Sequence, residues 1–352
     1  MAIDSLNTGR TDMNGRFPLP EEEKKVEGSP LRIKDIAHIA FYTLGALFAA
    51  AATISLIVSL TVISAEAIAG TILTISLIGL GTLAGLKLWE LATPHLPECL
   101  RRVANIIQIL VTEVLGILSL IALFPVDLTK SDPKTRDEIN PEETPILMIH
   151  GFLGSSNNWV YHKSRLKAAG YQNVFSINLG NPLISIDEYA RRVDAKVKEI
   201  QELTGRKDIR LLTHSMGGLV ARQWRYTMAQ DTDVKEIVTL GTPLDGTYVA
   251  YGTLGLSSCG KEMFPGSDFV KQQQEWAAHD QTTDYYHIAT KTDLIILPMD
   301  SAKRGGSPGD KLKVDTLDAT GHVGYLFSDK AADLVIDYFK AKDRHPGPVS
   351  AV

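Results

Sequence analysis

The sequence has little cysteine and no excess of basic residues. Its two cysteines, Cys99 and Cys259, fall in different halves of 352 residues and form no C-x-x-C motif, so a disulfide framework is not expected. A formal net charge of −5 gives no basic footprint for nucleic acid. Clusters of metal ligands, phosphate-binding glycine loops and internal repeats are also missing, so we expect no metal, no cofactor and no nucleic-acid partner.

Residues 1–35 lack the charged and then apolar start of a cleavable signal peptide, and their polar composition predicts a flexible tail. Two long apolar runs follow, at 36–64 and 67–86. Each is near the roughly 20 residues that cross a bilayer as a helix. Their combined length is too great for a helical hairpin buried in a soluble core, so we predict a hydrophobic helical membrane region over residues 36–126.

A third apolar run, Ile106–Phe124, contains Glu113. An ionisable group at that depth is costly unless it is paired, protonated or turned toward a packed interior. The run is therefore interpreted as a third span, as an interfacial helix, or as a helix against the catalytic domain. A packing role for Glu113 is favoured over a functional one.

Basic residues precede the first span and follow the second, which predicts that both flanks are cytoplasmic. With two spans the C-terminal domain stays on the side of the N-terminus, and a third span would move it across. Lys130, Lys134 and Arg136 favour two spans. The two long spans and their short turn resemble the bilobed hydrophobic segment of chlamydial inclusion-membrane proteins.

After a polar linker at 127–144, the remaining chain, 145–352, alternates short β-branched runs with helical patterns. This alternation predicts an α/β domain, with a mainly parallel sheet covered by helices on both faces. Expected strands are 146–150, 174–179, 209–214, 236–240, 285–290 and 312–317. Expected helices are 186–204, begun by a capping box at Ser185, 216–228 and 330–340.

Ser215 stands where the strand 209–214 ends and a helix begins, the position of the nucleophile in a G-x-S-x-G elbow. Gly217 supplies one of the small residues of that motif, but Thr213 replaces the other. A serine nucleophile needs a histidine base and an orienting acid, which follow it in the order serine, acid, histidine. His322, in a glycine-flanked loop after the last strand, is the candidate base, with His214 and His287 as poorer alternatives.

Asp293 follows the strand 285–290 and is the favoured acid, ahead of Asp245 and Asp300. The oxyanion of an acyl-transfer intermediate also needs donors. We assign these to the backbone N–H groups of Phe152 and Met216, and expect His150 to brace the loop of Phe152 without titrating.

Five motifs carry a resemblance to the bacterial lipase and esterase branch of the α/β hydrolases. They are His150-Gly151-Phe152, His214-Ser215-Met216-Gly217-Gly218, Gly241-Thr242-Pro243, Thr292-Asp293-Leu294-Ile295 and Gly321-His322-Val323-Gly324. A further segment, Met263–Phe269, is similar to one in triacylglycerol lipases of this type. The resemblance spans about Pro145 to Phe339 and implies an α/β-hydrolase fold with Ser215 as nucleophile, Asp293 as acid and His322 as base.

These features predict a membrane-anchored serine hydrolase that cleaves carboxylic esters, most of all lipids, through an acyl-enzyme. The segment 248–266 is a candidate small lid. An acyltransferase or a thioesterase would use the same site, and a membrane scaffold with an inactive hydrolase-like domain is a third alternative. Acyl chain length, the alcohol portion of the ester and the oligomeric state are left open by the sequence.

Overall fold

The computed structural model of the chain describes residues 109, 113, 132–133, 135–253, 256–304, 311–318 and 320–344. The predicted tail, the predicted spans 36–64 and 67–86, and most of the third apolar run lie outside these residues. Within the described part, no helix combines the length and the apolar character needed to cross a membrane. Of the third run, only Ile109 and Glu113 are described, and both are helical and buried.

The core of the domain is a sheet of six strands in the order β2-β1-β3-β4-β5-β6, in which every neighbouring pair is parallel. The strands are β1 (Ile146–Ile149), β2 (Val174–Ile177), β3 (Asp208–His214), β4 (Asp233–Leu240), β5 (Asp284–Thr290) and β6 (Leu312–Leu317). The predicted mainly parallel sheet is therefore confirmed. Small shifts at the strand ends are the chief difference from the expected ranges.

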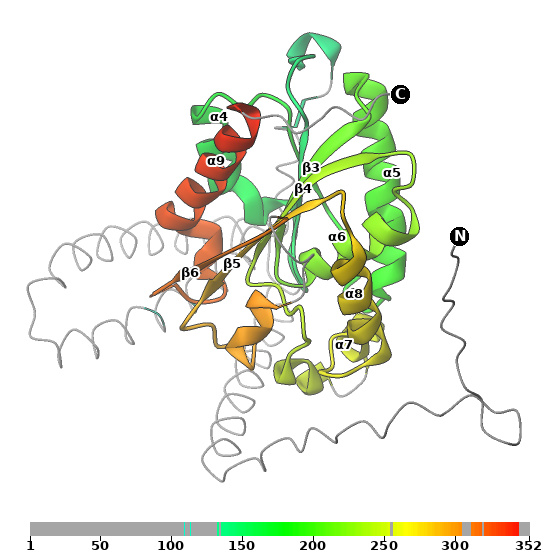
Figure 1. Cartoon of the computed structure of the whole chain (residues 1–352), viewed down its shortest axis with the longest axis vertical. Helices are drawn as coiled ribbons and strands as arrows, with labels where there is room; N and C mark the ends of the chain where they lie inside the picture. Colours follow the sequence, from blue (N-terminus) through cyan, green and yellow to red (C-terminus); the bar gives the residue numbers. More distant parts are fainter. Residues whose placement is uncertain are drawn as a thin grey trace, which may run out of the picture. The chain divides into compact units, whose positions relative to one another are not determined.

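Six described helices flank the sheet: α4 (Val160–Ala168), α5 (Ile186–Thr204), α6 (Met216–Thr227), α7 (Ser258–Glu262), α8 (Asp268–His279) and α9 (Asp329–Arg344). Short 3-10 turns occur at Arg136–Glu138 (η3), Ser156–Trp159 (η4), Tyr248–Thr253 (η5), Met299–Lys303 (η6) and Gly324–Phe327 (η7). Figure 1 shows α4 and α9 on one face of the sheet, and α5, α6 and α8 on the other. The predicted covering of both faces is thus confirmed.

Three of these helices escaped prediction because polar side chains occupy their buried positions or because they are short. In α4, His162 and Lys163 are buried where an amphipathic pattern needs apolar residues. In α8, Gln273 is buried, and α7 has only five residues. Helix α5 was predicted because its start is explicit: the Ser185 side chain accepts the N–H of Glu188, which is one half of the expected capping box.

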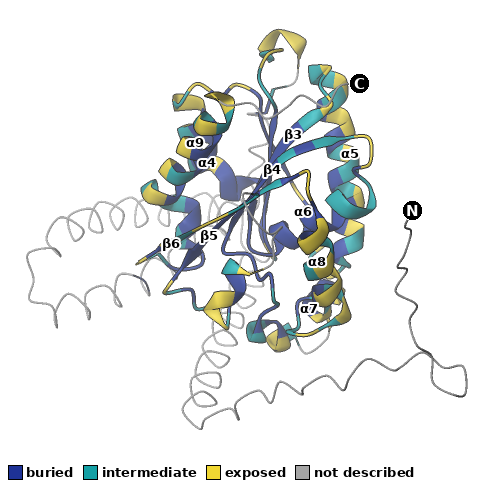
Figure 2. Ribbon diagram, in the orientation of Figure 1, coloured by how far each residue is buried: buried dark blue, intermediate teal, exposed yellow. Residues whose placement is uncertain are grey.

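Two apolar clusters fill the space between the sheet and its helices, and the strands between them are buried on both sides (Figure 2). One cluster joins Leu147, Leu211 and Ile237 to side chains of α5 and α6. The other joins Met148 and Leu212 to side chains of α4 and α9. Burial on both faces explains why these strands are continuous apolar runs in the sequence.

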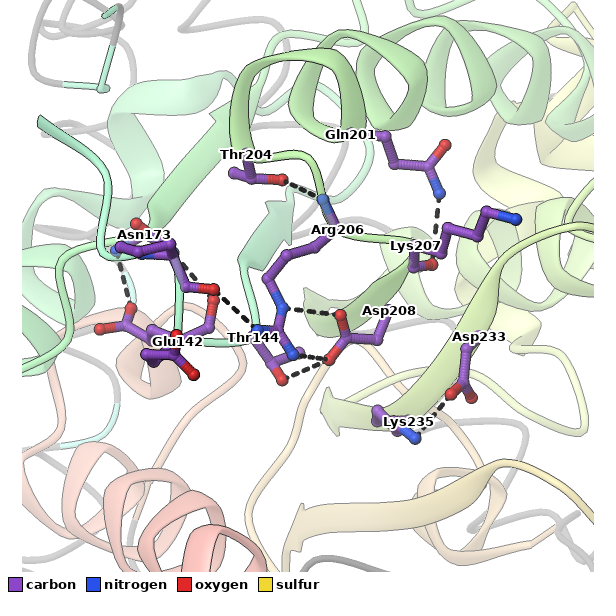
Figure 3. A network of polar contacts seen from close by, with 12 residues as sticks. Glu142, Thr144, Asn173, Gln201, Thr204, Arg206, Lys207, Asp208, Asp233 and Lys235 are labelled. Carbon is purple, nitrogen blue, oxygen red and sulfur yellow. Dashed lines mark hydrogen bonds and ion pairs between the residues drawn. The ribbon is translucent and has the colours of Figure 1, made fainter. Parts of the chain in front are cut away.

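The predicted linker, 127–144, is tied to the domain wherever it is described. Asp132 is buried and forms an ion pair with the Lys163 ammonium, and it accepts the N–H of Ser176 at 3.0 Å. At the amino ends of the strands, the Thr144 hydroxyl donates to Asp208, whose two oxygens also accept from Arg206 at 2.8 Å each (Figure 3). The contacts at Asp208 fasten the amino edge of the sheet, the edge opposite to the predicted site.

Candidate active site

Ser215 lies in a strained turn between β3 and α6. Its backbone angles are φ 55° and ψ −132°, a region that residues other than glycine rarely occupy. The Ser215 N–H donates to the carbonyl of Leu240 at 2.9 Å, which ties the turn to the carboxyl end of β4. Backbone strain held by surrounding structure is typical of functional sites, and it is the conformation that the sequence pattern predicts for an elbow.

The glycines after Ser215 allow α6 to approach β1 and the loop after β4. A β-carbon on Gly217 would lie 2.4 Å from the carbonyl oxygen of Ile149, and one on Gly218 would lie 2.3 Å from the hydroxyl of Thr242. The missing glycine of the motif is replaced without conflict. Thr213 is fully buried, and its hydroxyl donates to the carbonyl of Val238 at 3.0 Å.

The structure brings together three residues that are far apart in the sequence. The Ser215 hydroxyl oxygen lies 2.9 Å from Nε2 of His322, and Nδ1 of His322 lies 2.9 Å from Oδ2 of Asp293. All three side chains are buried. Asp293 follows β5 and His322 lies in the loop after β6, so each comes from the carboxyl end of a strand, where ligand sites of parallel sheets form.

The local charges prepare this triad for proton transfer. Burial opposes ionisation of Asp293, but the His322 charge and hydrogen bonds from His322, Ile296 and Ile295 outweigh it and lower the pKa of the carboxyl. Burial also opposes the charged imidazole, yet the charge and hydrogen bond of Asp293 raise the pKa of His322, and the Glu113 carboxylate acts in the same direction. A hydroxyl beside such an imidazole can pass its proton to Nε2 while Nδ1–H donates to Asp293.

His214 supports the triad from the side. Its Nε2 is 2.9 Å from the backbone carbonyl of His322, so Nε2 carries the proton and donates it. Burial, followed by the charge of His322, lowers the pKa of His214 to about 3. The ring is therefore neutral at physiological pH and acts as a brace for the loop of His322.

The loop after β1 lies against the serine. A β-carbon on Gly151 would be 2.6 Å from Cβ of Ser215, so only glycine lets this backbone approach so closely. Phe152 follows in the same loop, and Met216 is the first residue of α6, where helix N–H groups lack partners within the helix. The two residues expected to supply oxyanion donors thus adjoin the nucleophile: Met216 follows Ser215, and Phe152 follows Gly151, which packs on Ser215.

His150 holds this loop in place. The N–H of Leu179 donates to its Nε2 at 2.9 Å, so Nδ1 carries the proton and donates to the carbonyl of Gly151 at 2.8 Å. Burial lowers the pKa of His150 to about 4. These two hydrogen bonds agree with the expectation that His150 braces the loop.

The alternative acids and bases have other partners. Asp245 pairs with Arg304 and Gln274, and Asp300 is an exposed residue that pairs with Lys303. His287 lies within β5, between Thr239 and Arg222. Among the residues described, no group of three His, Cys, Asp or Glu side chains could hold a metal ion.

One residue near this site was not predicted to belong to it. Glu113 accepts hydrogen bonds from the backbone N–H groups of Val323 and Gly324, which directly follow His322. Of the three interpretations of its apolar run, this position agrees with packing against the catalytic domain. The sequence signal at Glu113 itself was a charged residue inside an apolar run.

A family match and several solved structures are similar to this chain. Residues 144–294 match the family described as alpha/beta hydrolase fold. Similar solved structures include Bacillus licheniformis lipase BlEst2 in its mature form, with 20% identity over 60% of this chain and 95% of that one, at a TM-score of 0.47. Aspergillus fumigatus lipase B is 15% identical over 58% of this chain and 54% of its own, about half its length, at a TM-score of 0.48.

A third similar structure is Paleococcus ferrophilus monoacylglycerol lipase, with 13% identity over 56% of this chain and 96% of that one, at a TM-score of 0.43. The parallel sheet, the strand–turn–helix at Ser215 and the family match together give an α/β-hydrolase fold.

Proposed function

Starting from the α/β-hydrolase fold of this chain, we propose that it is a serine hydrolase that cleaves carboxylic esters. The observation that carries the proposal is the continuous hydrogen-bonded path from the Ser215 hydroxyl through His322 to Asp293, with 2.9 Å at each step. A strained serine at the carboxyl edge of the sheet supports the same assignment.

In the proposed reaction, Nε2 of His322 accepts the proton of Ser215 as the hydroxyl oxygen attacks the ester carbonyl. Asp293 stabilises the imidazolium, and the N–H groups of Phe152 and Met216 donate to the oxyanion. His322 then gives its proton to the leaving alcohol, and the Ser215 acyl ester remains. Water, deprotonated by His322, attacks the acyl-enzyme, and collapse of the second intermediate releases the acid and returns the proton to Ser215.

Apolar side chains around the carboxyl edge favour a lipid ester as the substrate. The exposed large apolar residues of the described part are Leu153, Val160, Leu183, Tyr251, Leu256, Met299 and Val314. All except Val160 and Val314 lie in connections that follow the carboxyl end of a strand, the edge that holds Ser215. Exposed apolar side chains in these connections suit a long acyl chain better than a small polar ester.

Membrane attachment through residues 36–64 and 67–86 is part of the same proposal, because it would hold the site close to amphiphilic esters. It is tested by expressing the full chain and extracting the membrane fraction with alkaline carbonate and then with detergent. Release by detergent alone supports integral attachment. Release by carbonate would contradict it.

The proposed activity is tested with a fluorophosphonate probe and a panel of esters of increasing acyl length. We expect covalent labelling and hydrolysis in the wild type, and loss of both in Ser215→Ala. Ser164→Ala is the matched control, because Ser164 is an exposed residue within α4 and outside the candidate lid. A folded wild-type protein that shows no Ser215-dependent labelling would refute the proposal. Adding a competing alcohol measures acyl transfer against hydrolysis in the same assay.

A further inference from the structure

The loop that carries His322 is attached to a residue far outside the α/β sheet. Glu113 belongs to the third apolar run, more than 200 positions earlier in the chain, and only 7% of its surface is exposed. Its Oε1 accepts the N–H of Val323 at 2.8 Å and the N–H of Gly324 at 3.1 Å. A single carboxylate oxygen therefore holds the two peptide groups that follow the candidate base.

Gly321, the residue before His322, lies close to the same carboxylate. A β-carbon built on Gly321 would lie 2.2 Å from Oε1 of Glu113 and 2.5 Å from its Cδ. Every other amino acid at position 321 would displace Glu113 or the loop. The Gly-His-Val-Gly segment thus packs closely against the Glu113 side chain. Gly321 is needed because any side chain there would meet the Glu113 carboxylate.

The rest of the loop is held through its carbonyl groups. His214 donates to the carbonyl of His322 at 2.9 Å, the Thr292 hydroxyl donates to that of Thr320 at 3.1 Å, and Nε2 of His162 lies 2.9 Å from that of Tyr325. In contrast, the N–H groups of Val323 and Gly324 are bound by Glu113. Without it, these two buried or half-buried donors lose a charged acceptor, which is among the stronger hydrogen-bond partners in proteins.

We propose that Glu113 is a positioning residue for His322: by binding the two backbone N–H groups that follow the histidine, it fixes the imidazole between Ser215 and Asp293. The inference rests on the proposed hydrolase function. It also means that the apolar segment before the hydrolase domain contributes to the site.

The charges around His322 make this role measurable. The titratable groups near its ring are Asp293, Glu113, His214 and Tyr325. His214 is neutral above a pKa of about 3, and burial holds the pKa of Tyr325 well above its usual value. Burial raises the pKa of the Glu113 carboxyl, while His322 and the two N–H donors oppose this shift. Asp293 raises the pKa of His322 most, and an ionised Glu113 acts in the same direction.

Two variants of the full chain separate hydrogen bonding from charge. Glu113→Gln removes the charge but keeps an oxygen able to accept both N–H groups, because Oε1 alone accepts them now. Glu113→Ala removes both. Since misplacing a reacting group by about 1 Å can cost 10²-fold in rate, we expect Glu113→Ala to lower kcat by about 10²-fold with little change in KM. Glu113→Gln should keep most of kcat.

Loss of the charge should lower the pKa of His322 in both variants, so the acid limb of the kcat/KM profile moves to lower pH. Glu143 offers a matched control: its carboxylate accepts the N–H groups of Gln172 and Asn173 just before β2, at the amino edge of the sheet. Glu143→Gln and Glu143→Ala should change thermal stability but neither kcat nor the acid limb.

The outcomes distinguish this inference from the proposed function. A wild type without Ser215-dependent labelling refutes the hydrolase itself. An active wild type in which the Glu113 variants match the Glu143 variants in kcat and in the acid limb overturns the positioning role alone. If Glu113→Ala does not fold, Glu113→Asp decides, because its carboxylate is one methylene shorter and cannot reach both N–H groups. A Glu113→Asp variant with the kcat of the wild type would overturn the positioning role.

Discussion

Replacing Asp293 by asparagine tests the proposed triad most sharply, because the surrounding backbone fixes how the new side chain must lie. Oδ1 of Asp293 accepts the N–H groups of Ile295 at 2.9 Å and Ile296 at 2.8 Å, while Oδ2 faces Nδ1 of His322. An asparagine keeps the two backbone bonds only if its oxygen takes the place of Oδ1. Its NH₂ group then points at the imidazole.

This orientation reverses the tautomer of His322. Nδ1 must accept from the amide, so the proton moves to Nε2, the atom that has to receive the proton of Ser215. Wrong-tautomer substitutions of this kind lower kcat by about 10⁴-fold in comparable triads, which corresponds to about 5 kcal/mol in the activation free energy. Stability should fall little, since both backbone bonds remain.

The assay compares kcat/KM on a chromogenic short-chain ester and the rate of fluorophosphonate labelling. Asp245→Asn and Asp300→Asn are the controls, because both residues were alternative acids and both pair with other side chains. The reasoning is refuted if Asp293→Asn stays within about tenfold of wild type while remaining folded. It is equally refuted if either control variant loses as much activity as Asp293→Asn.

Three further predictions follow from the same geometry. Asp293 raises the pKa of His322 above 6.5 against the effect of burial, and only the neutral ring can accept the serine proton. We therefore expect kcat/KM to fall with decreasing pH along a limb centred above 6.5. A pH–rate profile whose acid limb is centred below that value would contradict this. In Gly217→Ala the new β-carbon would meet the Ile149 carbonyl. We expect urea unfolding to show a loss of about 1–3 kcal/mol in stability, and we expect the rate of fluorophosphonate labelling to fall. A stabilised variant would show that α6 moves freely. Thr213→Gly restores the common elbow motif but removes a buried side chain and its hydrogen bond to Val238. We expect it to lower the free energy of unfolding by about 1–3 kcal/mol without raising kcat/KM, and a faster enzyme would contradict this.

The sheet could be predicted from the sequence because its signal is local. The central strands contain apolar runs, and β6, Leu312–Leu317, was predicted with its observed bounds. The edge strand β6 carries exposed residues and still reads as a strand from its alternation. The helices without apolar periodicity were missed, since His162, Lys163 and Gln273 are buried through polar partners that lie far away in the sequence.

The site was predictable to the extent that its residues stand in fixed order after strand ends. Ser215, Asp293 and His322 each follow a strand of a parallel sheet, so the topology alone brings them to one edge. The acid was the weakest assignment, because three aspartates follow strand ends and charge does not separate them. The structure separates them by distance: only Asp293 among these three is recorded in contact with His322 in the described part of the chain.

Glu113 shows where sequence reasoning stops. A charged residue within an apolar run indicates either a polar partner or a packed interior, but nothing in the local pattern identifies that partner. Here the partners are two backbone N–H groups beside His322, and backbone groups leave no trace in the sequence. The one trace is Gly321, which is needed because a β-carbon there would meet Glu113. A glycine beside a candidate base is usually attributed to loop flexibility. In this chain its absent side chain makes room for a carboxylate, so Gly321→Ala should disturb the contact of Glu113 with the loop of His322.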